Sequence, residues 1–208
     1  MNARLPREFF ARSTLAVARD LLGARLVRLE GDQRLAGVII ETEAYIGEED
    51  QGCHCRHGPT PRARLLYGPP GMAYVYFTYG MHWLFNVVTQ REGFPAAVLI
   101  RALWPTEGLE RMAQRRAPHP MPRWADGPAK LCRALGIDGG FHGLDLGAPK
   151  APLFFETGIP IPDNWVITGP RVGLNRVPEP WKSIPWRFRL TQEALQQLRQ
   201  RLAKGTDA

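Results

Sequence analysis

The segment ETEAYIGEEDQGCHC, residues 41–55, places five carboxylates, a tyrosine, a histidine and two cysteines within fifteen residues. Carboxylates beside a tyrosine can serve acid–base chemistry, whereas a histidine with cysteines can bind a metal ion. Charged residues at this density are also common in exposed turns. The segment is therefore a metal site, an acid–base site or a charged surface turn, and the surrounding sequence has to decide among them.

A metal site is the least favoured of the three. Cys53, His54, Cys55 and His57 lie close together, but they lack the two-residue gaps with which a loop wraps a tetrahedral zinc ion. Cys132 is the only other cysteine, and neither HExxH nor the HxE…PCxxC pattern of zinc deaminases occurs. The sequence therefore predicts no bound metal ion.

The first part of the segment has the alternation of a β-strand. Between residues 38 and 46 the even positions form one face that can pack on a core, while Glu41, Glu43 and Tyr45 share the other face. Charges on an open sheet face are usually solvated, so the pattern alone predicts that Glu41 lies at the surface. The same expectation holds for the acidic turn that follows: Glu48, Glu49 and Asp50.

A second group of reactive side chains lies in AYVYFTYGM, residues 73–81, where three tyrosines fall within six residues before a glycine. Such aromatic residues commonly stabilise a sheet as core or cross-strand pairs. A tyrosine beside a turn glycine in a basic protein could instead enter a stack of nucleic-acid bases. The residues themselves leave both interpretations open.

Hydrophobic spacing and turn residues predict the elements that must position these groups. Helices are expected at 13–22 (with Ser13 as cap), 106–116, 127–135 (with Asp126 as cap) and 191–203. Strands are expected at 25–30, 34–46, 72–78, 83–89, 96–103, 152–156, 165–168 and 186–190. A long loop covers 47–71, and no composition shift marks a second domain. We therefore predict one α+β domain over residues 1–208 with a mostly antiparallel sheet, in preference to a Rossmann-type fold.

Composition narrows the class of function. The net charge of +7 and the pI of about 9.8 suit a nucleic-acid binder. Three cysteines cannot form a disulfide framework, which favours a reducing cytoplasm. No apolar run reaches membrane-spanning length, and charges at positions 8, 12, 19 and 20 interrupt any signal-peptide core.

Five blocks in order resemble the alkyladenine (3-methyladenine) DNA glycosylase family. They are ETEAYIGEEDQGCHCRHGPTPRAR, GMAYVYFTYGMHWLFNVVTQ, AAVLIRALWPTEGLERM, DGPAKLCRALGI and RVGLNR. The resemblance implies a curved, partly barrel-like antiparallel sheet with surrounding helices and no cofactor. It also implies a monofunctional enzyme that flips alkylated or deaminated purines out of duplex DNA and hydrolyses the N-glycosidic bond, initiating base excision repair.

The resemblance also implies a role for each matched residue. Glu43 would be the general base and Arg101 would hold the attacking water with it. The base pocket would be formed by Tyr45, His54, Tyr76 and Asn86. Tyr79 would wedge into the duplex with Met81 beside it in the minor groove. The DNA backbone would be contacted by Arg62, Arg64, Lys130 and Arg133.

Alternatives remain at this stage. Arg101 follows an apolar run and could be a structural arginine paired with a buried carboxylate, and His54 could be an exposed loop residue. A non-catalytic damaged-DNA-binding protein of the same fold is the alternative function, while action on RNA or free nucleosides leaves the wedge tyrosine without a purpose. The expected partner is duplex DNA with damaged purines, bound by a cytoplasmic, nucleoid-associated monomer without an obligate protein partner. The cysteines beside His54 depart from the family pattern and would be prone to oxidation if exposed.

Overall fold

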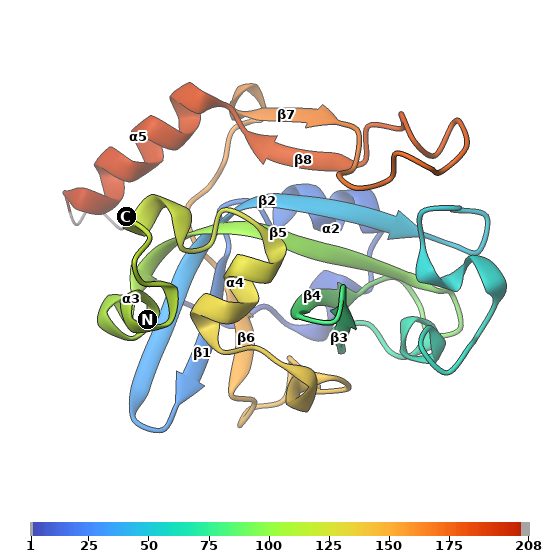
Figure 1. Ribbon diagram of the computed structural model, residues 1–208, viewed down its shortest axis with the longest axis horizontal. Helices are drawn as coiled ribbons and strands as arrows, with labels where there is room; N and C mark the ends of the chain where they lie inside the picture. Colours follow the sequence, from blue (N-terminus) through green and yellow to red (C-terminus); the bar gives the residue numbers. More distant parts are fainter. Residues whose placement is uncertain (1, 205–208) are drawn as a thin grey trace.

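The protein is built around one antiparallel sheet of eight strands (Figure 1). The structure is a computed structural model that describes residues 2–204. The strands are β1 (Arg25–Glu30), β2 (Gln33–Ile46), β3 (Ala73–Thr78), β4 (His82–Val88), β5 (Ala96–Glu107), β6 (Leu153–Glu156), β7 (Val166–Gly169) and β8 (Arg187–Leu190). The main path runs β3-β4-β5-β2-β1-β6, and the β7–β8 hairpin joins it through β8 and β2.

Strand β2 is the centre of this sheet, because it pairs with three neighbours. It pairs with β5 from Ala36 to Ile46, with irregular register near Gly37 and Glu41. Its first half also pairs with β1, whereas residues 41–43 pair with β8. The backbone at Glu43 is therefore held on both sides, by β5 and by β8, before the chain enters the long loop.

The helices are α1 (Arg7–Phe10), α2 (Thr14–Asp20), α3 (Leu109–Arg116), α4 (Pro128–Leu135) and α5 (Gln192–Ala203). Helix α2 packs against β2 and β5, and α4 packs against β4 and β5. In Figure 1, α4 lies in front of the sheet and α2 lies behind it. The Thr42 hydroxyl donates a 2.7 Å hydrogen bond to the Ala18 carbonyl of α2. Because side chains alternate along a strand, Glu43 and Tyr45 point to the face opposite α2, as the sequence predicts.

The predicted fold class is confirmed: the structure is α+β with a curved, antiparallel sheet and helices around it. Within residues 2–204 the sheet does not close into a barrel, because its path ends at β3 and β6. The predicted β1–β2 hairpin is also present, with Gly31 at φ +58° between paired Glu30 and Gln33. The single domain predicted for 1–208 includes residues 1 and 205–208, which lie outside the described residues.

Several predicted boundaries and caps were wrong. The strand expected to end at residue 103 continues to Glu107, since Ala36 and Gly37 of β2 still pair with it there. The next helix therefore begins at Leu109 rather than 106. The short helix α1 and the 3₁₀ turns inside the loop 47–71 were not expected. Ser13 occupies the cap position of α2 without a side-chain capping bond, and Asp126 bonds to Lys130 while Gly127 caps α4.

Gly37 of β2 lies against Leu103 and Trp104 of β5 without room for a side chain, so we predict that Gly37→Ala is destabilising. An added Cβ would lie 2.2 Å from Leu103 Cδ1 and 2.8 Å from the Trp104 carbonyl oxygen. Overpacking of this kind costs about 1–3 kcal/mol, which thermal unfolding would register as a lower Tm. Gly169→Ala is the matched control, because nothing lies within 4 Å of a Cβ built there. Equal Tm values for the two variants would contradict this packing argument.

Candidate active site

A cavity of about 360 Å³ opens on the face of the sheet away from α2. Alternate residues of the strands line it, because side chains two positions apart share one face of a sheet. They are Tyr74 and Tyr76 from β3, Asn86 from β4, and Leu99 and Arg101 from β5. Further lining residues come from β2, the loops and the start of α4: Tyr45, His54, Tyr79, Val172, Leu174 and Pro128. The volume falls within the range of roughly 300–1,000 Å³ that is typical of small-molecule sites.

The carboxylate of Glu43 lies behind the wall of this cavity. Its side chain is fully buried, and it does not itself line the cavity. The Val172 N–H donates to Oε1 at 2.7 Å, the Tyr45 hydroxyl donates to Oε2 at 2.8 Å, and Arg101 Nε lies 3.4 Å from Oε1. These three neighbours do line the cavity, so a single layer of groups separates the Glu43 carboxylate from the cavity space.

Burial decides the protonation behaviour of Glu43. It raises the pKa of the carboxyl above the usual range, whereas Arg101, the Val172 N–H and the Tyr45 hydroxyl each lower it. The net direction is upward, so Arg101 opposes the rise in pKa but does not cancel it. Burial and the Glu43 charge also raise the pKa of Tyr45, which keeps its phenol protonated as the donor to Glu43.

Arg101 belongs to a wider ion-pair network than the sequence indicates. Its Nε donates to Glu41 Oε1 at 2.9 Å, and Arg187 Nε donates to the same oxygen at 2.6 Å. The expectation that Glu41 is a solvated surface charge was therefore wrong, because two guanidinium groups hold it at 15% side-chain exposure. Arg101 is thus both a structural partner of Glu41 and a neighbour of Glu43, and both sequence-level alternatives describe part of its environment.

The aromatic part of the cavity is tightly connected. The His54 and Tyr76 rings meet edge to face with centroids 4.5 Å apart, and His54 Nδ1 lies 2.8 Å from the Tyr74 hydroxyl. Asn86 Nδ2 donates to the Tyr74 carbonyl at 3.1 Å. His54 is therefore not an exposed loop residue. Tyr74 was missed as a site residue, although its spacing from Tyr76 already placed the two on one face.

The predicted wedge residues lie at the tip of the β3–β4 hairpin, beside the cavity and its neighbouring groove. Tyr79 is 85% exposed and Met81 is 68% exposed, at the tip of the β3–β4 hairpin. Tyr79 adopts φ +51° and Gly80 φ +65°, so two successive left-handed residues form the tip. Tyr79 borders the cavity, while Met81 borders the neighbouring groove beside α4.

The four basic residues predicted for the DNA backbone have different surroundings. The Arg62 guanidinium lies 5.0 Å from the centre of the Tyr76 ring, and Arg64 is exposed on the same loop. Lys130 forms a 2.7 Å ion pair with Asp126, whereas Arg133 lines the groove beside α4. All four lie on elements around the cavity or its neighbouring groove.

The acidic turn corrects one further expectation, and the cysteines do not meet the condition set for oxidation. Asp50 is fully buried and paired with Arg171, so it is not a surface charge, although Glu48 and Glu49 are exposed. Cys53 and Cys55 are also buried, with their sulfur atoms 2.7 Å apart. Among residues 2–204, no group of three or more His, Cys, Asp or Glu side chains is arranged to hold a metal ion.

The comparisons with known proteins fit this geometry. A family model described as Methylpurine-DNA glycosylase (MPG) matches residues 8–194. The chain belongs to the methylpurine-DNA glycosylase family.

Curated relatives agree with the family. A Myxococcus xanthus protein is 47% identical over 184 residues, covering 88% of both chains. An Anaeromyxobacter dehalogenans protein is 47% identical over 192 residues, covering 92% of this chain and 85% of its own, and a Methanocella arvoryzae protein is 46% identical over 188 residues, covering 88% and 90%. Each is named "Putative 3-methyladenine DNA glycosylase". This methylpurine-DNA glycosylase family member is therefore an N-glycosylase, a hydrolase of DNA repair, and the enzymatic interpretation of the sequence is confirmed.

Within the described part of the chain, none of the helices combines the length and the apolar character needed to cross a membrane. The predicted cytoplasmic location, nucleoid association and monomeric state stay predictions.

The protonation state of His54 in the cavity can be measured. Burial, with help from Arg62 and Arg56, lowers the pKa of His54 to about 4. We therefore predict that its ring signals in an NMR titration stay those of neutral imidazole down to about pH 5, well below the usual midpoint near 6.5. Arg62→Ala should move the midpoint upward, because a neighbouring positive charge is removed. A wild-type midpoint near 6.5 would show that the ring is solvated.

Proposed function

We propose that this protein binds duplex DNA, rotates a damaged purine nucleotide into the aromatic cavity and hydrolyses its N-glycosidic bond. The observation that supports this proposal is the juxtaposition of three features: an aromatic cavity, a carboxylate that is buried behind its wall and paired with Arg101, and an exposed tyrosine at its edge. We propose 3-methyladenine as a substrate, following the names of the relatives. Further candidates are 7-methylguanine, hypoxanthine and ethenoadenine.

Rotation of a nucleotide out of the duplex needs a replacement for the lost stacking. Unstacking costs a few kcal/mol, and a side chain that fills the gap offsets part of that cost. Tyr79 suits this role because its ring stacks while its hydroxyl tolerates water. Met81 would lie beside it in the minor groove. The contacts to the DNA backbone would come from Arg62, Arg64, Lys130 and Arg133. Lys130 would contact a phosphate while it is also paired with Asp126.

Alkylation at N3 or N7 makes a purine cationic, and the cavity offers aromatic rings to such a guest. Tyr45, His54 and Tyr76 line it, and a cation over an electron-rich ring gains about 0.5–2 kcal/mol. The Asn86 amide, fixed by the Tyr74 carbonyl, would crowd the exocyclic amine of undamaged guanine. Selectivity would therefore combine charge recognition with steric exclusion.

The chemistry would be a hydrolytic displacement at the sugar. Water enters at the cavity wall between Arg101 and Val172, both of which contact Glu43. Glu43 takes a proton from the water, the water oxygen bonds to C1′, and the purine leaves with the electron pair of the C1′–N9 bond. The ionised carboxylate also stabilises the positive charge that develops on the sugar, as carboxylates do in glycosidases.

The first test replaces the proposed base and follows the release of free purine from methylated duplex DNA. Glu43→Gln should lower the single-turnover rate by about 10²–10⁴-fold while DNA binding persists. Since the base must be ionised, the wild-type rate should rise with pH as Glu43 loses its proton. Because the pKa of Glu43 is raised, this acidic limb of the pH–rate profile should lie above the usual pKa range of glutamate.

Two controls accompany this variant. Glu49→Gln, at an exposed position of the neighbouring turn, should leave the rate unchanged. The Tm of Glu43→Gln at neutral pH should not fall, because the substitution removes a charge that burial disfavours. Base release that persists in Glu43→Gln would remove Glu43 as the base, and no release by wild type would remove the glycosylase proposal.

The second test concerns the wedge. Tyr79→Ala should lower kcat/KM on duplex DNA by roughly 10- to 100-fold, since aromatic stacking on a base contributes about 1–3 kcal/mol. Tyr79→Phe keeps the ring and should remain close to wild type. On single-stranded DNA carrying the same lesion the two variants should be equal, because no paired stack has to be filled. An equal loss on both substrates would argue against a wedge.

A further inference from the structure

Arg171 has no role in the proposal so far, yet it is one of the most completely buried charges in the protein. Its guanidinium forms a two-pronged ion pair with Asp50, with Nη1–Oδ2 at 2.5 Å and Nη2–Oδ1 at 2.7 Å. Both side chains are 0% exposed. Arg171 Nη1 also donates to the Ala44 carbonyl at 3.0 Å, so the same group holds the end of β2.

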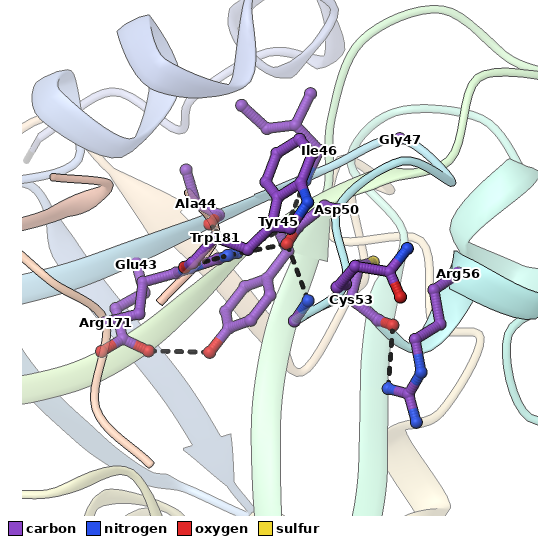
Figure 2. A network of polar contacts seen from close by, with 12 residues as sticks. Glu43, Ala44, Tyr45, Ile46, Gly47, Asp50, Cys53, Arg56, Arg171 and Trp181 are labelled. Atoms are coloured by element: carbon purple, nitrogen blue, oxygen red, sulfur yellow. Dashed lines mark hydrogen bonds and ion pairs between the residues drawn. The ribbon is translucent and has the colours of Figure 1, made fainter. Parts of the chain in front are cut away.

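Asp50 folds the loop that leaves β2. Its Oδ2 accepts the Ile46 N–H at 3.2 Å and its Oδ1 accepts the Gly52 N–H at 2.9 Å. Figure 2 shows Asp50 in the same polar network as Glu43, Tyr45 and Arg171. The ion pair therefore joins two loops, 47–53 and 170–174, that lie 121 residues apart in the chain at their point of contact.

Both oxygens of the Glu43 carboxylate are bonded by groups next to Arg171. Val172, the following residue, donates its N–H to Oε1. Tyr45 donates its hydroxyl to Oε2, and the Arg171 guanidinium lies 4.6 Å from the centre of the Tyr45 ring. Arg171 is thus the chain neighbour of one donor and packs against the ring of the other.

The fit around Arg171 leaves little freedom. A Cβ added at Gly52 would lie 2.9 Å from Arg171 Nη2 and 2.6 Å from Leu174 Cδ1. The planar guanidinium presents two parallel donors to a carboxylate, which the single ammonium of lysine cannot reproduce. The contact between the two loops therefore requires an arginine at position 171.

We propose that Arg171 is a positioning residue of the reaction: its pair with Asp50 holds the Val172 N–H and the Tyr45 hydroxyl on the two oxygens of Glu43. This arrangement orients the Glu43 carboxylate. It also favours the charged form of Glu43, because both donors form stronger hydrogen bonds to a carboxylate than to a carboxylic acid. The inference rests on the proposed role of Glu43 as the base.

The test removes both charges together, since one partner left alone would be an uncompensated buried charge and could unfold the protein. The variant is Asp50→Leu/Arg171→Met, with Arg171→Lys as a milder companion that keeps the charge. The matched control is Glu156→Leu/Arg34→Met, which removes a partly buried ion pair between β2 and β6. Two quantities are measured: hydrogen exchange of the Val172 amide, and single-turnover purine release from methylated duplex DNA as a function of pH.

In Asp50→Leu/Arg171→Met we expect at least tenfold faster exchange of the Val172 amide, because its bond to Glu43 is released. The maximal rate of base release should fall by about 10- to 100-fold and its acidic limb should move to higher pH, while DNA affinity changes little. Arg171→Lys should move both quantities in the same direction by less. The control variant Glu156→Leu/Arg34→Met should have a lower Tm, but the exchange rate of its Val172 amide and the acidic limb of its pH–rate profile should stay at the wild-type values.

Each alternative result has a distinct meaning. A lower Tm with unchanged Val172 exchange and an unchanged pH limb would reduce Arg171 to a structural role and overturn the inference. Wild-type behaviour of Arg171→Lys in both measurements would overturn the requirement for the two-pronged pair. If wild type releases no purine while the Val172 amide still depends on Arg171, the glycosylase proposal fails and the anchoring of Val172 stands.

Discussion

The candidate active site depends on one constraint: the carboxylate of Glu43 is kept inside the protein, directly behind the cavity wall. Burial disfavours its charge, and three donors from three segments oppose that cost: Arg101 on β5, Tyr45 on β2 and the Val172 amide on a distant loop. The pairing of β2 with both β5 and β8 fixes the backbone on which the carboxylate stands. The sheet, the Val172 loop and the side chains of Arg101 and Tyr45 therefore all contribute to holding the Glu43 carboxylate.

A second layer of charges supports the first. Glu41 binds the guanidinium groups of Arg101 and Arg187, and Asp50 binds that of Arg171. Each of these pairs involves a residue within ten positions of Glu43 and a partner far along the chain. The acidic segment 41–55 is thus mainly an interior anchor for distant arginines, and only Glu48 and Glu49 in it behave as an ordinary charged turn.

The sequence predicted well what depends on local pattern. The period of two put Glu43 and Tyr45 on the face away from α2, and the glycine after Tyr79 indicated an exposed hairpin tip. It failed where the outcome depends on contacts between distant segments. Nothing near Asp50 shows that Arg171 will bury it, and nothing near Glu41 shows that Arg187 will pair with it, because ion-pair partners leave no local periodicity. Lesion preference likewise depends on the width of a cavity that is built from four strands, three loops and the start of α4.

The neutral state of His54 has a consequence for the guest. An imidazolium next to Tyr76 would repel a methylated purine, which itself carries a positive charge. The desolvated ring, with its pKa near 4, presents only an uncharged edge at physiological pH. Under the proposed function, arginines around the rim would attract the phosphates of DNA. The interior, where Arg101 is paired with Glu41 and Glu43, would still accept a cation, so the two tasks would be spatially separated.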